Sequence, residues 1–457
     1  MTDRAVHLHE LAAGPDLLAL HAANPERYPF LLQSVASGTV QGRYDILFAF
    51  PGETIALDPE NRLPGARQVD AFLGALDAGW RKEAIPRSGS ELPFTGGWFV
   101  YLGYELAGEI EPKLRLDLPD DLPVAAATRI PVAIVTEHAT GRSWIVAEEG
   151  HAQRIADVQS DIAASPSFVE KGFHVGEMRE ENPSQYTDAV ARAIRYIIDG
   201  DVFQANLSRK WETTVPAGTR HADIYSRLRA ANPGPFNGLA TWGEKAVISS
   251  SPERLAEFRD GIVQTRPIAG TRPRGATPDE DEALTKELIG HPKERAEHVM
   301  LIDLERNDMG RVAKPGSVHV DEMMVLETYA HVHHIVSNIR AEAREDVTPG
   351  EIIAAVFPGG TITGCPKVRC MEIISELEAS PRSAYTGSMG YLNRDGSFDL
   401  NILIRSMIRD GERLSFRAGA GIVYDSVPEN ELAETRAKAR GLEVALAPRG
   451  DSGKDSR

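Results

Sequence analysis

The sequence predicts an α+β fold built on antiparallel sheets. Two observations support this: short segments that alternate apolar and polar residues come in consecutive groups, and only a few helical patterns separate those groups. Strands gathered in this way favour antiparallel sheets over repeated βαβ units. The clearest strand-like segments lie at 246–250, 254–258, 262–266, 384–392, 399–408 and 413–424.

Composition limits the function. The 457 residues carry a net charge of −17, which argues against nucleic-acid binding, so an anionic substrate needs a local basic site or a metal ion. Cys365 and Cys370 are the only cysteines, which excludes a disulfide framework and favours a reducing compartment. Because no apolar run approaches membrane-spanning length, we expect a cytoplasmic protein without membrane association.

The chain divides at a polar run, Glu177–Ser184. We predict an N-terminal domain with its linker over 1–170, which includes strand-like segments at 42–50 and 94–104, and a larger domain over 184–447. The tail, 448–457, is polar and is expected to be disordered.

Four helices and one polar-faced strand organise the larger domain. Helical patterns cover 184–200, about 280–305, the segment after Pro366, and 428–446. Between the first two helices, residues 202–211 form a strand that places Gln204, Asn206 and Ser208 on one face. A strand with one polar face is typical of a cavity wall.

The stretch Gln264–Gly275 predicts an anion-binding turn. Its first residues alternate like a strand that stops at Pro267, and two glycines, a threonine and two arginines follow. Glycine allows close approach to the backbone, and the arginine fork fits a carboxylate. A polar surface loop is the alternative for these residues considered alone.

Two pairs of glutamates, Glu294 with Glu297 and Glu431 with Glu434, stand three residues apart on predicted helices. Each pair therefore shares a face, where like charges repel unless solvent or a cation separates them. A solvated acidic surface, with Glu434 paired to Lys438, is one interpretation; a Mg²⁺ site is the other, because this ion takes one or two carboxylates plus substrate oxygens.

Two further segments carry polar chemistry. Three histidines lie within 331–334, which is compatible with a metal site or a polar core. The segment Phe357–Lys367 has the glycine spacing of a phosphate loop, but Cys365 stands where the lysine is required, so nucleotide binding is excluded. Its glycine-rich turn before a helix still suits a carboxylate.

Pro267-Ile-Ala-Gly-Thr-Arg-Pro-Arg274 resembles the signature of the chorismate-utilising enzymes, namely anthranilate, aminodeoxychorismate, isochorismate and salicylate synthases. The resemblance implies two packed antiparallel sheets flanked by helices. It also implies a Mg²⁺ cofactor that holds the ring carboxylate of chorismate, with Glu297 and Glu434 as direct ligands and Glu294 and Glu431 in support.

The same resemblance assigns roles to single residues. The implied catalytic positions are His334, Thr271, Glu253 and Ala269. The implied substrate contacts are Gly270, Thr271, Thr361, Tyr385, Arg405, Gly419, Ala420, Gly421, Lys438 and Gln204. Because Arg405 is expected in an apolar strand, its charge requires an anionic partner.

The relatives differ at two positions. Isochorismate and salicylate synthases carry a water-activating lysine where this chain has Gln204, so amination is favoured over hydration. Ala269 occupies the place of the nucleophilic lysine of typical aminodeoxychorismate synthases, and alanine there is similar to anthranilate synthases.

Other motifs, among them Gln204-Ala-Asn-Leu207 and Arg43-Tyr-Asp-Ile46, resemble aminodeoxychorismate synthase component I. We therefore predict that enzyme, which makes 4-amino-4-deoxychorismate for p-aminobenzoate and folate synthesis. Anthranilate synthase component I is the alternative, and a chorismate-binding regulator without catalysis is a third hypothesis. Because neither cysteine lies in a nucleophile elbow, we expect ammonia from a separate glutamine amidotransferase subunit, in a heterodimer.

Overall fold

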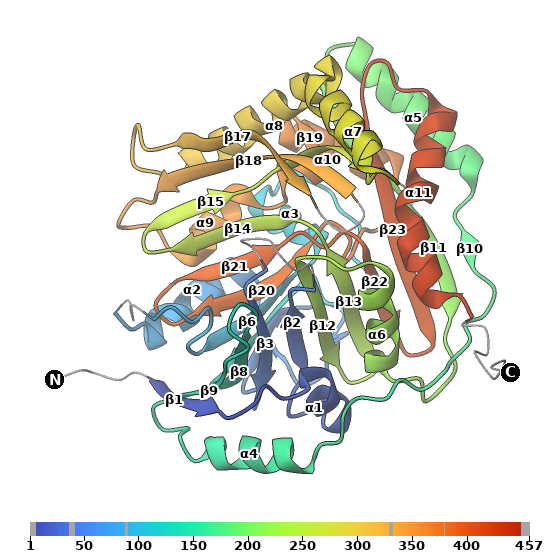
Figure 1. Ribbon diagram of the computed structural model, residues 1–457. Helices are drawn as coiled ribbons and strands as arrows, with labels where there is room; N and C mark the ends of the chain where they lie inside the picture. Colours follow the sequence, from blue (N-terminus) through green and yellow to red (C-terminus); the bar gives the residue numbers. More distant parts are fainter. Residues whose placement is uncertain (1–5, 36–41, 87–89, 329–331, 379, 449–457) are drawn as a thin grey trace, which may run out of the picture.

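A computed structural model describes residues 6–35, 42–86, 90–328, 332–378 and 380–448 (Figure 1). Two large sheets dominate it, and their strands pair antiparallel except for β4 with β5. This confirms the predicted α+β class and its two packed sheets. No helix of the described residues is long and apolar enough to cross a membrane. The expected disorder of the tail concerns Pro448 and residues 449–457, and the latter lie outside the described ranges.

The first sheet joins strands from both ends of the chain. Along its hydrogen-bonded order it contains β1 (Val6–Leu11), β9 (Ser143–Glu148), β8 (Val132–Glu137), β3 (Tyr44–Ala49), β2 (Phe30–Gln33), β12 (Phe236–Trp242), β13 (Lys245–Ser251), β22 (Ser406–Asp410), β23 (Arg413–Ile422), β11 (Gln204–Thr214) and β10 (Arg179–Glu180), with β19 (Gly364–Cys365) paired to β11.

The second sheet also joins strands from distant parts of the chain. Its order is β16 (Ile268–Pro273), β18 (Val332–Glu342), β15 (Ile262–Thr265), β14 (Arg254–Arg259), β21 (Phe398–Asn401), β20 (Ser388–Asn393), β6 (Gly97–Leu102), β7 (Ala125–Ile130), β4 (Thr54–Leu57) and β5 (Arg67–Gln68), with β17 (His319–Thr328) paired to β18. Strands from 1–170 and from 184–447 are therefore hydrogen-bonded within both sheets.

Helices cover the outer faces of the two sheets. The helical elements are α1 (Leu17–Ala23), α2 (Phe72–Glu83), η1 (Tyr104–Leu106), α3 (Ala107–Ile110), α4 (Arg154–Ala164), α5 (Pro183–Ile198), α6 (His221–Ala231), α7 (Pro278–Gly290), α8 (Pro292–Gly310), α9 (Pro349–Val356), η2 (Gly360–Ile362), α10 (Lys367–Leu377) and α11 (Pro428–Leu446). Apolar residues of α1, α6 and α11 pack on the first sheet, and those of α2, α8 and α9 pack on the second.

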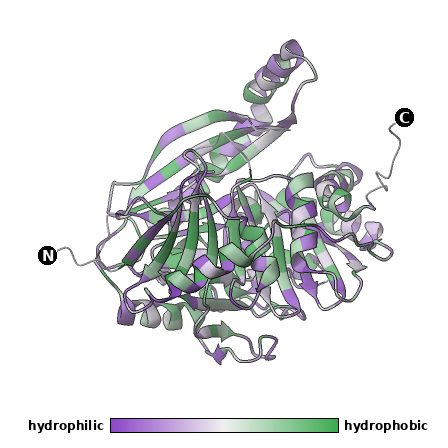
Figure 2. Ribbon diagram, turned by 60° about the horizontal axis from the view of Figure 1, so that its bottom comes forward, coloured by the Kyte–Doolittle hydropathy of each residue, from purple (hydrophilic) through white to green (hydrophobic). Residues whose placement is uncertain are grey.

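A third apolar cluster fills the space between the sheets. Phe30 and Phe48 of the first sheet meet Phe99 of the second, and the rings of Phe30 and Phe99 are stacked with centroids 4.0 Å apart. Figure 2 shows the apolar residues concentrated in the strands at the centre of the molecule. The alternation seen in the sequence is thus explained by burial of one or both faces of each strand.

Two predicted elements differ from the structure. The helix expected over 280–305 is two helices, α7 and α8, because Pro292 disfavours helical backbone at His291, where ψ is 114°. The anion-binding turn after Pro267 is a strand, β16, that pairs with β18. Its glycine forms a bulge within the sheet, a feature that composition does not distinguish from a turn.

Candidate functional site

The bulge in β16 carries the first part of the site. Ala269 pairs with Ile335 and Thr271 with His334, so Gly270 is the extra residue, and its φ of +75° suits glycine. The bulge brings the Thr271 hydroxyl within 2.9 Å of Nδ1 of His334. The predicted residues 269–271 and His334 are therefore neighbours.

His334 is held as a neutral imidazole. Burial lowers its pKa to about 4, the Gly270 backbone opposes this shift, and the charge of Arg405 adds to it. His333 faces a different environment, since its ring nitrogens contact the Thr328 hydroxyl and the Asp281 carboxylate. His331 lies outside the described residues. His333 and His334 therefore lie in different environments.

Arg405 is a half-buried cation that lacks an anion among the described residues. It lies in a bend before β22 with φ of +53°, and not within a strand as the sequence predicted. Its guanidinium makes no hydrogen bond or ion pair with any residue in the described ranges. Burial lowers the pKa of Arg405, and only Tyr385 is close enough to oppose this. An unpaired buried charge is costly, so this position favours an anionic ligand.

Two glycines of β23 leave room for polar side chains. A Cβ at Gly419 would lie 2.7 Å from the Tyr385 hydroxyl and 2.9 Å from Oδ1 of Asn206, and a Cβ at Gly421 would lie 2.4 Å from Nε2 of Gln204. The Gly419–Gly421 segment is part of this strand, within the strand-like segment predicted over 413–424. Ala420 faces the opposite way, into the apolar cluster with Leu207 and Ile422.

Glu253 and Thr361 form the wall beside β16. Burial raises the pKa of the Glu253 carboxyl to about 7, against the lowering effect of the Thr361 hydroxyl beside it. Buried polar atoms without a hydrogen-bond partner among the described residues gather here. They include Gln204 Oε1, Asn206 Oδ1, Glu253 Oε1 and Thr361 Oγ1. Such atoms are rare unless a ligand or water completes them.

One glutamate pair borders the bulge. Oε1 of Glu294 lies 3.2 Å from Nη1 of Arg272, and its other oxygen would lie 3.0 Å from a Cβ at Gly270. Glu297 follows about one helical turn later on α8 and is half-buried. The acidic face of α8 therefore points at least partly toward the site, and not wholly into solvent.

The second glutamate pair, Glu431 and Glu434, is connected to the site by contacts of Lys438. Glu434 lies 2.7 Å from Nζ of Lys438, as expected for residues four apart on a helix, and Nζ also donates to the Gly419 carbonyl at 3.0 Å. Glu431 is half-buried one turn earlier. Among the residues that the structure describes, no three His, Cys, Asp or Glu side chains form a ready metal cage. A Mg²⁺ ion here would need substrate oxygens, which is a common arrangement for this ion.

Two polar residues of the site received no role from the sequence. Asn206 lies over Gly419, and its place on the polar face of the strand was the available signal. Glu305 of α8 accepts a hydrogen bond from the Gly360 backbone at 3.2 Å, and burial raises its pKa to about 7. Nothing in the helical pattern distinguished Glu305 from a surface acid.

Comparisons with known proteins identify the family of the chain. The family described as "chorismate binding enzyme" matches residues 30–443. An anthranilate synthase component I-like protein from Synechocystis is 42% identical over 394 residues, which cover 84% of this chain and 79% of that protein. Aminodeoxychorismate synthase component 1 from Bacillus subtilis is 40% identical over 385 residues, 80% of each.

A solved structure extends the match to the fold. Anthranilate synthase component I from Streptococcus pneumoniae superposes with a TM-score of 0.78 at 30% identity, and the match covers 90% of this chain and 94% of that one. The chain belongs to the chorismate-binding enzyme family, and it is a chorismate-utilising enzyme. The named relatives divide between two reactions and favour neither.

Replacement of Glu253 by Gln should remove a pH dependence of stability. Because the folded-state pKa of about 7 exceeds the ordinary value of 4.5, the folded chain keeps a proton that the unfolded chain loses. The free energy of unfolding therefore falls as pH rises through this window, on the order of 3 kcal/mol in all. Urea unfolding should show that the free energy of unfolding of the variant, relative to that of the wild type, is larger at pH 8 than at pH 5.

The exposed substitution Glu429→Gln is the matched control, and its difference from the wild type should not change with pH. A Glu253→Gln difference that is equally constant between pH 5 and pH 8 would mean that this carboxyl is ionised throughout.

Proposed function

We propose that the chain is aminodeoxychorismate synthase component I, which replaces the C4 hydroxyl of chorismate by ammonia and retains the enolpyruvyl group. The observation that carries the chorismate-binding part of this proposal is the half-buried Arg405 guanidinium, which has no ion pair among the described residues and lies near Tyr385. A dicarboxylate such as chorismate supplies the anion that this cation lacks, and a guanidinium binds a carboxylate through two parallel hydrogen bonds.

The two carboxylates of chorismate would be bound at opposite ends of the site. Arg405 and Tyr385 would take the enolpyruvyl carboxylate. The ring carboxylate would lie between α8 and α11, where Glu297 and Glu434, supported by Glu294 and Glu431, would hold Mg²⁺. The closeness of Glu294 to Gly270, and of Glu434 to the Lys438–Gly419 contact, supports this donor set. The metal would neutralise the ring carboxylate in an acidic surrounding.

Proton transfer would fall to Glu253 and His334. Departure of the C4 hydroxyl breaks a C–O bond and needs a proton, so that water leaves, while the attacking ammonia gives up a proton as the C–N bond forms. A carboxyl with a pKa of about 7 can donate at neutral pH, and His334 can accept because it is neutral. The Thr271 hydroxyl orients His334 through its contact with Nδ1.

Ala269 rules out one route to the same product. Its methyl group is buried and cannot form a covalent adduct, so ammonia must attack the ring directly or use another nucleophile. Lys438 is a lysine that borders the site, but Glu434 and the Gly419 carbonyl both contact its Nζ. Ala269 is the specific observation that favours anthranilate synthase component I as the second candidate.

Ammonia would come from a separate glutamine amidotransferase subunit. A glutaminase needs a cysteine that is activated as a thiolate. Both cysteines here instead have a raised pKa, which keeps the thiol protonated. Burial raises the pKa of the Cys365 thiol and raises that of Cys370 far more, and the Cys370 thiol donates to the Gln204 carbonyl. Neither thiol can serve as the nucleophile of this chain, which supports a heterodimer.

Product analysis decides between the two reactions. We expect the chain, given chorismate, Mg²⁺ and ammonium, to form an aminated product that keeps the enolpyruvyl mass and that an added lyase converts to p-aminobenzoate. Mass spectrometry and fluorescence measure both. Fluorescent anthranilate with pyruvate would instead establish the second candidate, and unchanged chorismate would leave a binding protein without catalysis.

Replacement of Arg405 by Met should separate binding from folding. Loss of charged hydrogen bonds worth about 1.5–3 kcal/mol should raise the KM for chorismate by about 10- to 100-fold. The free chain should become no less stable, because an unpaired buried charge has been removed. Steady-state kinetics and thermal unfolding test this, with Arg405→Lys as the variant that keeps the charge and loses the fork. Lower stability with unchanged KM would assign Arg405 to the fold.

Replacement of Glu297 or Glu434 by Gln should raise the Mg²⁺ concentration needed for half-maximal activity, since each removes a charged oxygen ligand. The control is Glu429→Gln, which lies on the first turn of α11 and is exposed. Mg²⁺ titration of activity measures the effect. Wild-type metal dependence in both variants would remove the metal assignment.

A further inference from the structure

A second buried carboxyl lies behind the one that the proposed reaction uses. Glu305 of α8 and Glu253, just before β14, are each only 5% exposed. Neither of them forms an ion pair with a residue in the described ranges. A carboxyl with so little access to water is costly to ionise. Because Glu305 has no part in the reaction proposed above, its burial requires an explanation.

One short segment connects the two carboxyls. The short helix η2 begins at Gly360, and the Gly360 amide donates to Oε1 of Glu305 at 3.2 Å. The next residue is Thr361, whose hydroxyl lies beside the Glu253 carboxyl. Two adjacent residues of η2 therefore contact the two acids. A displacement of the Glu305 side chain would change the position of Thr361 relative to Glu253.

The packing around this segment is tight. A Cβ at Gly360 would lie 3.0 Å from Oε1 of Glu305 and 2.6 Å from Cδ2 of Leu304. A Cβ at the preceding Gly359 would lie 2.9 Å from Cδ1 of Ile402. Contacts this short leave no room for a side chain at either glycine. The backbone of η2 is therefore packed directly onto α8, and the hydrogen bond from Gly360 fixes its position there.

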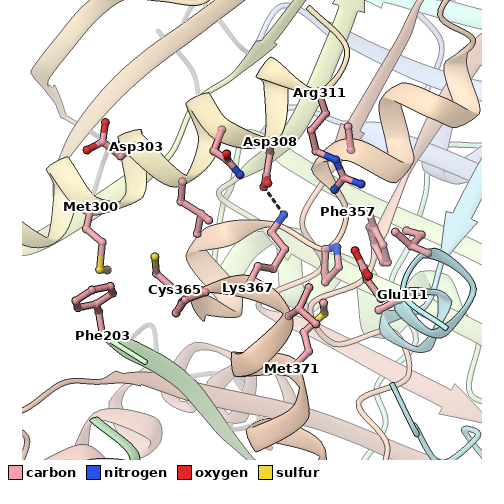
Figure 3. Close-up of a pocket in the computed structure, with 18 of the residues that line it drawn as sticks. Glu111, Phe203, Met300, Asp303, Asp308, Arg311, Phe357, Cys365, Lys367 and Met371 are labelled. Carbon is pink, nitrogen blue, oxygen red and sulfur yellow. Dashed lines mark hydrogen bonds and ion pairs between the residues drawn. The ribbon is translucent and has the colours of Figure 1, made fainter. Parts of the chain in front are cut away.

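Four other groups face Glu305. Burial raises the pKa of Glu305 to about 7, against the opposing charge of Lys367. The charge of Asp308 adds to the rise, and the Gly360 amide and the Thr265 hydroxyl oppose it. Figure 3 shows that Lys367 pairs with Asp308, so the ion pair of this cation is with another acid. Glu305 therefore changes its charge near neutral pH.

The charge of Glu305 acts on Glu253. Burial is the largest cause of the raised pKa of Glu253; the Thr361 hydroxyl opposes the rise, and the charge of Glu305 adds to it. The Ile268 backbone and the charge of Lys438 also oppose it. When Glu305 loses its proton, the new negative charge makes it harder for Glu253 to lose its own, because like charges in one buried region repel.

A carboxyl supplies something at this position that a neutral side chain does not. An amide side chain can accept the same hydrogen bond from Gly360 without the cost of a buried charge. The property that only an acid provides is a negative charge that appears as the pH rises. Such a charge is useful beside a group that must keep its proton until the reaction uses it.

We propose that Glu305 is a positioning residue for the reaction, which holds η2 against Glu253 and keeps Glu253 protonated as the pH rises. The inference rests on the proposed function, in which Glu253 donates the proton to the departing hydroxyl. That proton comes from Glu253, and the proton released by ammonia goes to His334. Glu305 therefore gains and loses no proton during turnover.

Replacement of Glu305 by Gln tests the effect of the charge, because it keeps an oxygen for the Gly360 amide and removes the ionisable group. The alkaline limb of kcat/KM for chorismate, measured with free ammonia held constant, should move to lower pH by about one unit, since Glu253 then loses its proton more readily. Asp303→Asn is the matched control. Asp303 is an acid of the same helix and is 64% exposed, so its replacement should leave the alkaline limb in place.

Replacement of Glu305 by Leu tests the positioning. It removes the charge and also leaves the buried Gly360 amide without its acceptor, so η2 and Thr361 should shift. The KM for chorismate should rise several-fold in this variant and by less in Glu305→Gln, which keeps the hydrogen bond. Equal KM values in the two variants would mean that the hydrogen bond to Gly360 positions nothing in the site, and would overturn this part of the proposal.

Urea unfolding provides a measurement that requires no catalysis. Charge repulsion acts only when both acids are ionised, so the stability effects of Glu253→Gln and Glu305→Gln should add at pH 5 and should not add at pH 8. At pH 8 the double variant should gain less stability than the sum of the two single gains, because each single replacement already removes the shared repulsion. Additive effects at both pH values, or an alkaline limb that stays in place in Glu305→Gln, would overturn the proposal.

The two proposals fail in different ways. A chain that shows this coupling in unfolding but forms no aminated product would contradict the proposed function. A chain that aminates chorismate but shows no coupling between the two carboxyls would overturn the role of Glu305.

Discussion

A half-buried guanidinium, with no anion beside it among the described residues, is the constraint around which the candidate site is arranged. Arg405 is fixed at positive φ just before β22, and its backbone carbonyl accepts a hydrogen bond from the backbone amide of Ser250 of β13, so the fold holds its side chain near His334 and Tyr385. That unpaired charge destabilises the folded chain until an anion binds. Binding energy gained in this way is available to position the substrate for reaction.

Other polar and charged groups lie around the same space as Arg405. The charge of Arg405 interacts with His334 and Tyr385. The Tyr385 hydroxyl and Oδ1 of Asn206 both lie close to Gly419. Lys438 connects that glycine to Glu434 and acts on the charge of Glu253. Elements distant in sequence thus place a cation, a neutral base and a protonatable acid around one space. That combination suits substitution on a polyanion with proton transfer.

The sequence predicted the strands and the last helix well, because their patterns are regular: residues 428–446 were expected to be helical, and α11 covers Pro428–Leu446. It did not predict the break at His291, which a single proline causes, or the strand β16, whose Gly-Thr-Arg composition is equally typical of a turn. Arg405 was expected inside a strand, and its positive φ depends on tertiary context. The candidate site residues were proposed from family resemblance, whereas the closeness of Asn206 to Gly419 required coordinates.

A crystal structure of the chain with chorismate and Mg²⁺ tests the central claim most directly. The account predicts the enolpyruvyl carboxylate on the Arg405 guanidinium and the Tyr385 hydroxyl. It also predicts the C4 substituent facing Glu253 and His334, and the metal between Glu297 and Glu434. Chorismate bound elsewhere, with the Arg405 side chain still unpaired, would contradict the account.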